Sequence, residues 1–373
     1  MFSLFDRSLA KMKANMENEI NCIPFGLPRF QKFIPGIEQK KYYLITANSG
    51  VGKTQIADYM FIHSPYEFLL NNPDSDIKIK VFYYSLEMDK LSKILKWACY
   101  KLYKEYGIFT TTKQLQSIGE NRCTQELYDK YCETRDYFEN LEQYVTIHDE
   151  SINPYGIYKE LVQYANNSGK IVQRDKIIYD NSTGEVKETI KVFDHYVPNN
   201  PKEYVIIFID HISLITTEKG KDLHGTITKL SSNDLITLRN RFGYIPVVVQ
   251  QQASDKEKQQ FTFKGQSIET KLEPSLDGLG DNKLTQRDAN LVLGLFAPNR
   301  YGIEEHRGYN INKLKDYYRS LSVLKNRDGI SDIKVPLYFN GATGFFKEYP
   351  KLKDMNIDAY NFVENQIKEE IDG

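Results

Sequence analysis

The stretch ANSGVGKT, residues 47–54, decides the fold of this chain. It matches the phosphate-loop pattern GxxxxGK[ST], except that alanine replaces the first glycine. Gly50 and Gly52 let the loop turn so that backbone N–H groups point inward, while Lys53 can reach the terminal phosphates and the Thr54 hydroxyl can bind Mg²⁺. A glycine-rich turn can also serve only to join a strand to a helix, but the intact GKT favours binding of ATP or another nucleoside triphosphate. The predicted nucleotide-binding residues are Ala47, Asn48, Ser49, Gly50, Val51, Gly52, Lys53 and Thr54.

Short apolar runs recur along the chain and alternate with segments of helical periodicity. The runs lack polar alternation, which is typical of strands buried on both faces of a parallel sheet. The pattern therefore predicts an α/β fold with a mainly parallel central sheet flanked by helices. The predicted strands cover residues 42–46, 80–84, 204–209, 245–249 and 291–296. The clearest helical stripe consists of Leu91, Ile94, Leu95, Ala98 and Leu102.

Two carboxylates follow predicted strands at the positions where open α/β sheets place their ligands. Asp210 ends the apolar strand in VIIFIDHISLI and can hold Mg²⁺ opposite Thr54, although an aspartate there could equally cap the next element. Glu87 in FYYSLEM follows another strand and is the candidate general base that activates water. The competing interpretation of Glu87 is a glutamate in the first turn of the next helix, where the helix dipole favours it.

A run of glutamines follows the fourth predicted strand in VVVQQQ. A polar group at that strand end could sense the γ-phosphate or a bound nucleic acid strand. Period-two alternation puts Gln250 and Gln252 on one face and Gln251 on the other. The spacing alone leaves the choice between them open.

Composition bounds the class of protein. The 373 residues suffice for one large α/β domain with appendages. A net charge of -1 neither implies nor excludes a nucleic acid partner, because a local basic channel would not show in the sum. The four cysteines lack CxxC spacing, which indicates neither a disulfide framework nor a zinc site. We expect a soluble cytoplasmic protein that does not contact a membrane, because no signal-peptide core or membrane-length apolar run is visible.

Three segments make up the sequence. Residues 1–22 predict an amphipathic linker helix, whose stripe of Phe5, Leu9, Met12, Met16 and Ile20 could pack on a neighbouring subunit or on its own domain. Residues 23–350 form the predicted motor domain, with an inserted surface hairpin at about 170–201. Residues 351–373 form an acidic tail with a terminal amphipathic helix.

These motifs, in this order, resemble the DnaB-type (superfamily 4) hexameric replicative DNA helicases, in particular their C-terminal RecA-like motor domain. The resemblance runs from about residue 23 to residue 346 and begins with IPFGLPRFQKFIPGIEQKKYYLIT. Alanine at position 47 is also familiar in that family. The DHIS sequence, residues 210–213, is similar to the phage helicase-primase motors of the same superfamily. The resemblance implies a RecA-like P-loop ATPase fold with a C-terminal β extension.

Family resemblance also assigns residues that act between subunits. SVLKNRDGI resembles the family's arginine-finger strand, which implies that Lys325 and Arg327 reach the γ-phosphate of a neighbouring subunit. Residues two apart on a strand share a face, so both cations can aim at one phosphate cluster. A Lys-x-Arg sequence on a solvated edge strand is the ordinary alternative, and Arg287 and Arg300 are weaker finger candidates. The alignment register makes Gln252 the sensor glutamine.

The segment PSLDGLGDNKLTQRDANLVLGLF, residues 274–296, is similar to the family's DNA-binding loop and following strand. The resemblance places Gly280, Asp281, Asn282 and Lys283 where that loop contacts the backbone of single-stranded DNA. The loop's usual arginine is Gly280 here, which removes a cation. Other lysines could substitute as phosphate ligands, namely Lys283, Lys256, Lys258 and Lys264.

Together the motifs and the resemblance imply an ATP-dependent DNA helicase that uses Mg²⁺ and moves on single-stranded DNA as a homo-oligomeric ring, expected to be a hexamer. A primase or a helicase loader is a candidate further partner. The alternatives are a RecA-like recombinase or accessory ssDNA-dependent ATPase without unwinding activity, a packaging motor, and a non-enzymatic scaffold. The sequence shows no clustered carboxylate nuclease site for a packaging motor, and the intact Lys53, Glu87 and Asp210 argue against a scaffold.

Overall fold

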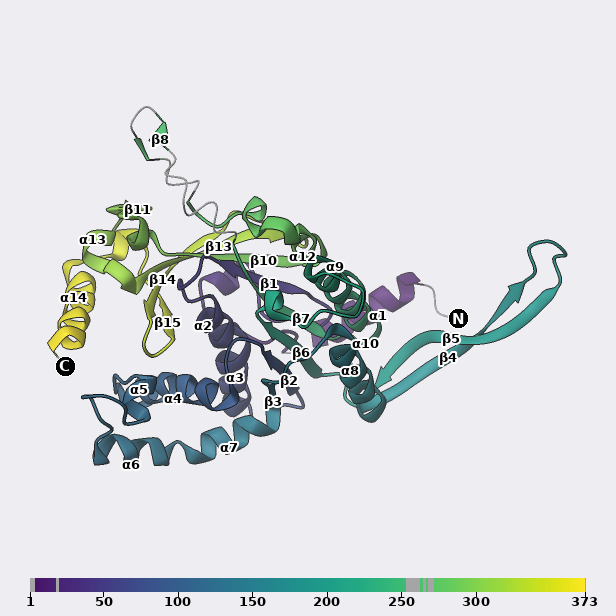
Figure 1. Ribbon diagram of the computed structural model, residues 1–373, viewed down its shortest axis with the longest axis horizontal. Helices are drawn as coiled ribbons and strands as arrows, with labels where there is room; N and C mark the ends of the chain where they lie inside the picture. Colours follow the sequence, from purple (N-terminus) through teal and green to yellow (C-terminus); the bar gives the residue numbers. More distant parts are fainter. Residues whose placement is uncertain (1–3, 18–19, 253–261, 264–265, 268–271, 373) are drawn as a thin grey trace.

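One nine-stranded sheet organises the chain (Figure 1). The computed structural model describes residues 4–17, 20–252, 262–263, 266–267 and 272–372. The strand order is β15-β14-β13-β10-β1-β7-β6-β2-β3. From β10 to β3 neighbouring strands are parallel, and β13, β14 and β15 add an antiparallel end. These strands are β1 Tyr43–Ala47, β2 Lys78–Ser85, β3 Val145–His148, β6 Glu203–Asp210, β7 Ile245–Gln251, β10 Leu291–Phe296, β13 Tyr318–Asn326, β14 Lys334–Asn340 and β15 Phe345–Glu348.

The predicted strands match this sheet closely, and the predicted 291–296 coincides with β10. Sequence analysis missed β3, an edge strand of four residues that is only partly buried. A short strand with one buried residue carries too little apolar pattern to be distinguished from a loop.

Helices cover both faces of the sheet, and each face has its own core. Alternate residues of β1 divide between them, with Tyr43 and Ile45 in one cluster and Leu44 in the other. The first cluster packs against α2, α3, α4 and α7, and the second against α8, α9 and α10. The helices are α1 Leu4–Glu17, α2 Lys53–Asp58, α3 Ser64–Asn71, α4 Lys90–Tyr106, α5 Thr112–Leu115, α6 Gln125–Glu133, α7 Arg135–Tyr144, α8 Pro154–Ser168, α9 Leu223–Thr228, α10 Ile236–Phe242, α12 Lys283–Asp288, α13 Ile311–Leu314 and α14 Ile357–Asp372.

Two of these helices continue through π-helical turns, η2 Tyr59–His63 between α2 and α3, and η4 Lys229–Leu235 between α9 and α10. Side chains fix the helix starts: the Asp89 carboxylate accepts a hydrogen bond from the Ser92 amide at the start of α4. Among the described residues, no helix has both the length and the apolar composition to cross a bilayer.

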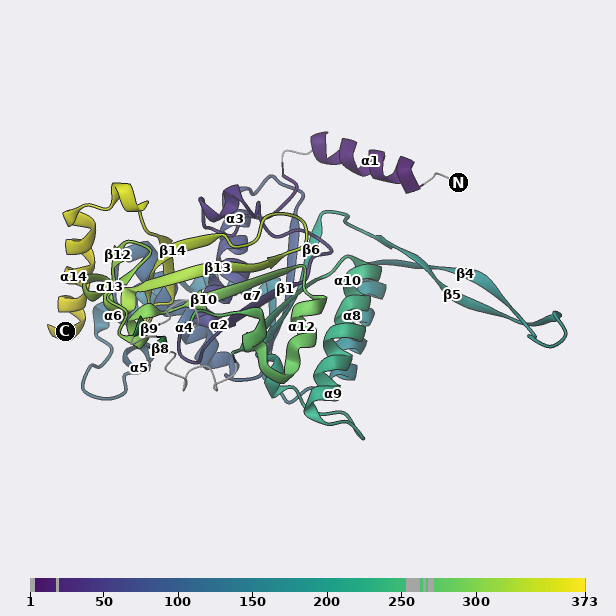
Figure 2. The same ribbon diagram turned by 90° about the horizontal axis from the view of Figure 1, so that it is seen from above.

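A long two-stranded hairpin projects from the body, built from β4 Gly169–Tyr179 and β5 Val186–Pro198 (Figures 1 and 2). It occupies most of the interval expected to hold a surface hairpin. Its base packs on the end of α10, where the rings of Tyr196 and Phe242 lie 5.3 Å apart. Farther out the arm contacts mainly itself, for example through the ion pair between Lys191 and Asp175. Short pairs β8 Thr262–Phe263 with β9 Gln266–Ser267, and β11 Glu305–His306 with β12 Tyr309–Asn310, lie outside the main sheet.

The two ends of the chain differ in how they pack. Helix α1 stands apart from the domain in Figure 2, and Phe5, Leu9, Met12 and Met16 expose between 44% and 77% of their surface. Packing of this stripe on its own domain, one of the two expectations, is not what the structure shows, and Ile20 lies beyond the helix end, against the main core. By contrast α14 packs on the β extension, where Val363 is fully buried.

Candidate nucleotide-binding site

The phosphate loop lies between β1 and α2, at the carboxyl edge of the parallel strands. Gly50 and Gly52 adopt φ angles of 68° and 102°, which residues with a Cβ rarely adopt. At Gly52 a Cβ would also lie 2.9 Å from Phe339 Cζ, so this position excludes a side chain on two grounds. Lys53 opens α2 and is largely buried, which places its ammonium at the positive end of the helix.

Thr54 and Asp210, the two predicted magnesium ligands, lie in direct contact. The Thr54 hydroxyl donates a hydrogen bond of 2.9 Å to Asp210 Oδ1. Asp210 ends β6, which is separated from β1 only by β7, so the sheet order brings the two residues together. A hydroxyl and a carboxylate are hard oxygen donors of the kind that hold Mg²⁺ beside substrate phosphates, so the residues present fit that ion.

Glu87 lies on the same edge of the sheet. Ser85, two residues earlier, pairs with Asp210 in the β2–β6 register. Glu87 is exposed and precedes Asp89, the N-cap of α4, so it is not in the first turn of that helix, which removes the competing interpretation. Its charge reaches His211, whose pKa is lowered by burial and by Lys53 and raised to a smaller extent by Glu87. Lys53, Glu87 and Asp210 therefore surround one space beyond the strand ends.

Gln252 contacts both the β1 strand and the predicted DNA-binding segment. Its Nε2 donates to Thr46 Oγ1 at 3.0 Å and to the Ser275 carbonyl at 3.2 Å. Gln250 is also buried, and its amide donates to the Leu279 carbonyl at 3.3 Å. The Gln252 side chain thus bonds to β1, the strand that leads into the phosphate loop, as a residue that senses the γ-phosphate would need to do.

Side chains from the antiparallel end of the sheet brace the loop, and sequence analysis missed most of them. Arg319 of β13 is buried, donates from Nε to the Val51 carbonyl at 2.8 Å, and stacks 4.6 Å from the Phe339 ring. Asn48 donates to the Tyr301 hydroxyl. An arginine in the buried strand YRSLSVLKN was the available signal, because a buried cation must have partners. Arg300 donates to the Ser49 carbonyl of its own loop, a position that does not suit a finger for a neighbour.

A buried charged cluster lies directly behind Asp210, and it too was missed. Lys93 is fully buried on α4, whereas Leu91, predicted in the apolar stripe, is 65% exposed. The prediction for this helix was therefore wrong at Leu91, because the face turned to the sheet meets carboxylates there. Asp58 of α2 also belongs to the cluster: burial raises the pKa of its carboxyl, and Lys93 acts against that rise.

Lys325 and Arg327 lie at the opposite edge of the sheet from the phosphate loop. In the strand register Ala47 pairs with Leu295, which pairs with Leu321, whereas Leu291 at the other end pairs with Asn326. Four to six residues of extended strand separate the two places, roughly 13–20 Å. Both side chains donate to the Arg287 carbonyl, so they point the same way although Arg327 follows the end of β13.

The predicted DNA-binding residues fall in a 3-10 helical turn, η6 Leu276–Asn282, and at the first residue of α12. The side chains of Asp281 and Asn282 lie outside the described residues, as do Lys256, Lys258 and Lys264. Lys283 is exposed, and its ammonium lies 3.9 Å from Asp277. Gly278 of the same turn packs so closely on Gln252 that a Cβ would overlap its side-chain oxygen.

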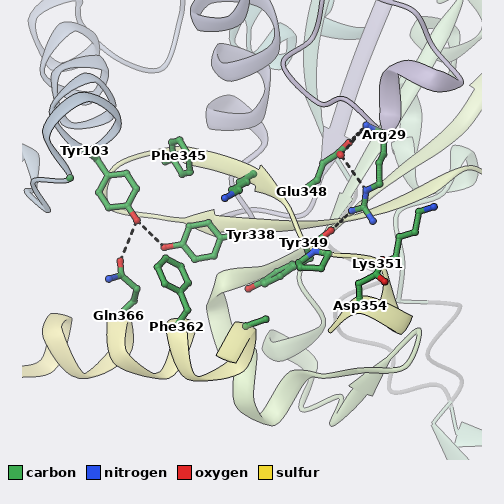
Figure 3. Close-up of a pocket in the computed structure, with 14 residues that line it drawn as sticks. Arg29, Tyr103, Tyr338, Phe345, Glu348, Tyr349, Lys351, Asp354, Phe362 and Gln366 are labelled. Carbon is green, nitrogen blue, oxygen red and sulfur yellow. Dashed lines mark hydrogen bonds and ion pairs between the residues drawn. The ribbon is translucent and has the colours of Figure 1, made fainter. Parts of the chain in front are cut away.

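A separate cavity of about 800 Å³ lies between α14, the end of α4 and strands β14 and β15 (Figure 3). Aromatic side chains line much of it, and the Tyr103 hydroxyl links the walls through Tyr338 and Gln366 at 3.4 and 3.2 Å. The ion pair of Arg29 and Glu348 closes one end in Figure 3. None of the phosphate-loop residues borders this cavity.

Comparison with solved structures places the fold. The chain is similar to the solved ATPase domain of a helicase, with a TM-score of 0.67 and 17% identity, covering 94% of this chain and 100% of that one. It is also similar to a DnaB-like replicative helicase studied for its interactions with primase, with a TM-score of 0.64 and 17% identity, covering 92% and 68% of the two chains. No family profile and no curated protein matches the sequence. The chain has the RecA-like P-loop ATPase fold, which confirms the predicted fold class.

Proposed function

We propose that this chain is the motor of an ATP-dependent DNA helicase that works as a ring of identical subunits, with ATP hydrolysed between neighbours. One observation carries the proposal: Lys325 and Arg327 lie at the edge of the sheet opposite their own phosphate loop. Neither side chain spans that separation, so cations at this edge can serve a phosphate only in another copy. A head-to-tail contact of this kind closes into a ring when its rotation permits.

Each composite site would divide the chemistry between two subunits. Lys53 holds the terminal phosphates, and Thr54 and Asp210 would hold Mg²⁺, which when bound neutralises phosphate charge. Glu87 accepts a proton from the attacking water as its oxygen bonds to the γ-phosphorus and the bond to the β-phosphate oxygen breaks. Arg327 and Lys325 of the neighbouring copy stabilise the charge on the transferred group.

The contact between Gln252 and the segment at Ser275 supports coupling of this chemistry to DNA. A change at the phosphate would reach the η6 turn through Gln252, because that side chain touches both β1 and the turn. Lys283, at the end of the turn, supplies an exposed cation for a DNA phosphate. We expect single-stranded DNA to lie against this turn in a hexameric ring, with a primase or loader as a candidate further partner.

The test is ATP hydrolysis and strand displacement by the purified full chain with Mg²⁺. We expect single-stranded DNA to stimulate hydrolysis and a forked duplex to be unwound, and Lys53→Ala to abolish both. No DNA stimulation in the native chain would contradict the proposal. Stimulated hydrolysis without strand displacement would favour the recombinase or accessory ATPase instead.

A further inference from the structure

Asp210 shares a closed, buried network with a lysine and a second aspartate. The Lys93 ammonium lies 3.3 Å from Asp210 Oδ2 and 3.5 Å from Asp58 Oδ2. It also donates to the Tyr83 hydroxyl at 2.7 Å, and that hydroxyl lies 2.8 Å from Asp58 Oδ1 and 3.2 Å from Asp210 Oδ2. The exposed fractions of the side chains of Lys93, Asp58 and Asp210 are 0%, 6% and 1%. Water therefore has little access, and these groups must satisfy one another.

The two oxygens of Asp210 have separate partners. Oδ1 accepts from Thr54 on the phosphate-loop side, and Oδ2 faces Lys93 and Tyr83 on the sheet side. A carboxylate held at one oxygen by a fixed cation cannot rotate freely. Contact with Lys93 therefore keeps Oδ1 directed toward Thr54, where a metal ion would be bound.

Lys93 is itself held in place. Asp58 gives the ammonium a second carboxylate, and Trp97 Nε1 donates to Asp58 Oδ2 at 3.0 Å. Lys93 lies in the first turn of α4, which begins at the Asp89 cap, while Asp58 ends α2, the helix that starts at the phosphate loop. Two helices thus fix the cation from two directions.

We propose that Lys93 is a positioning residue that orients Asp210 for Mg²⁺, with Asp58 holding Lys93 in place. The inference rests on the proposed role of Asp210 in nucleotide hydrolysis. It deepens that role, because groups that hold a metal ligand in place commonly change metal affinity by about 10- to 100-fold when they are removed.

The experiment measures ADP binding by isothermal titration calorimetry over a range of free Mg²⁺ concentrations. Lys93 does not contact the phosphate loop in the described structure, so Lys93→Met should leave ADP affinity without Mg²⁺ unchanged. We expect the variant to need about 10- to 100-fold more Mg²⁺ for half of the metal-dependent gain in affinity. Lys104→Met is the matched control, because Lys104 lies on the same helix and pairs with Glu67 away from Asp210.

Lys93→Met leaves two buried carboxylates facing each other and can impair folding. The double variant Asp58→Asn with Lys93→Met removes one charge of each sign, so it should fold and still show the raised Mg²⁺ requirement. A folded single or double variant with the native Mg²⁺ requirement would overturn the inference. So would an equal loss of ADP affinity with and without Mg²⁺, which indicates a purely structural role.

These outcomes separate the inference from the proposed function. A raised Mg²⁺ requirement in the variants, combined with no DNA-stimulated hydrolysis in the native chain, would retain Lys93 and reject the helicase. Native ADP binding that does not respond to Mg²⁺ at all would overturn both.

Discussion

His63 is a fully buried histidine in the helix that follows the phosphate loop. Its ring stacks on Tyr100 with centroids 3.9 Å apart and meets Trp97 edge-on at 5.8 Å. Nδ1 has no hydrogen-bond partner in the described structure. Burial, together with the charges of Lys104 and Lys93, lowers its pKa to about 3. The folded protein therefore keeps this ring neutral, and the stacked aromatic packing depends on that state.

The lowered pKa predicts a loss of stability in weak acid. The ordinary pKa of 6.5 applies in the unfolded chain, so stability is complete above pH 6.5 and falls as pH decreases toward 3. Between pH 7 and pH 5 the loss from this residue is about 2 kcal/mol. His63→Phe retains the stacking but cannot take up a proton, so its free energy of unfolding should fall by that much less over this range.

Urea unfolding of both proteins at several pH values from 7 to 5 measures the difference. His195→Phe, on the exposed hairpin, is the control and should follow the native chain. A His63→Phe variant with the native pH dependence would show that the ring is not kept neutral by burial.

Helix α1 contributes little to its own domain at the scale of elements. Its apolar stripe is exposed, whereas α14 at the other end of the chain buries Val363. An apolar stripe left in water is unfavourable by the area it exposes, so it favours association with another surface. Helix α1 therefore suits a contact between copies better than it suits support of the fold.

Deletion of residues 2–19 should lower the oligomeric state without unfolding the domain. We expect the free energy of unfolding to change by less than about 0.5 kcal/mol, because the deleted side chains are exposed. Mass photometry of the native and shortened chains reports the assembly, and calorimetry with ADP checks that the nucleotide site is intact. An unchanged assembly after deletion would exclude α1 from the interface.

At the scale of the whole molecule, the sheet separates the two halves of the proposed site. The phosphate loop, Asp210 and Glu87 occupy the carboxyl edge of the parallel strands, and Lys325 and Arg327 occupy the other edge. Each copy would carry half of two sites. Activity should then depend on which copies are neighbours.

Mixing two inactive variants tests this dependence. Lys53→Ala retains the cations of the far edge, and Arg327→Ala retains the phosphate loop, so their shared interface is complete. Each alone should lose about 1,000-fold or more in hydrolysis, the effect expected for a missing finger or loop lysine. An equal mixture should recover roughly a quarter of native activity, since one in four random head-to-tail interfaces is complete.

The control mixes Arg327→Ala with a chain that carries both substitutions and supplies no intact Arg327. That mixture should remain inactive. Recovery in the control, or no recovery in the test mixture although both variants assemble, would contradict a site shared between copies.

Prediction from sequence succeeded where the signal was local. Five buried strands were found because their apolar runs are continuous, and the phosphate loop was found because glycine, lysine and threonine stand at fixed spacing. Prediction failed at Leu91 and Lys93, where helical periodicity assigned the apolar residue to the core. The strand β3 and the brace from Arg319 were also missed, since their partners lie far away in the chain.

The sequence by itself determined the α/β class, the loop that receives the phosphates and the carboxylates that end its strands, because each depends on neighbours within a few residues. Tertiary structure alone decided that Thr54 bonds to Asp210, that Lys93 is buried between two carboxylates, and that Lys325 and Arg327 face away from their own loop. Strand order sets these relations by bringing together residues far apart in the chain. No local pattern of residue types records that order.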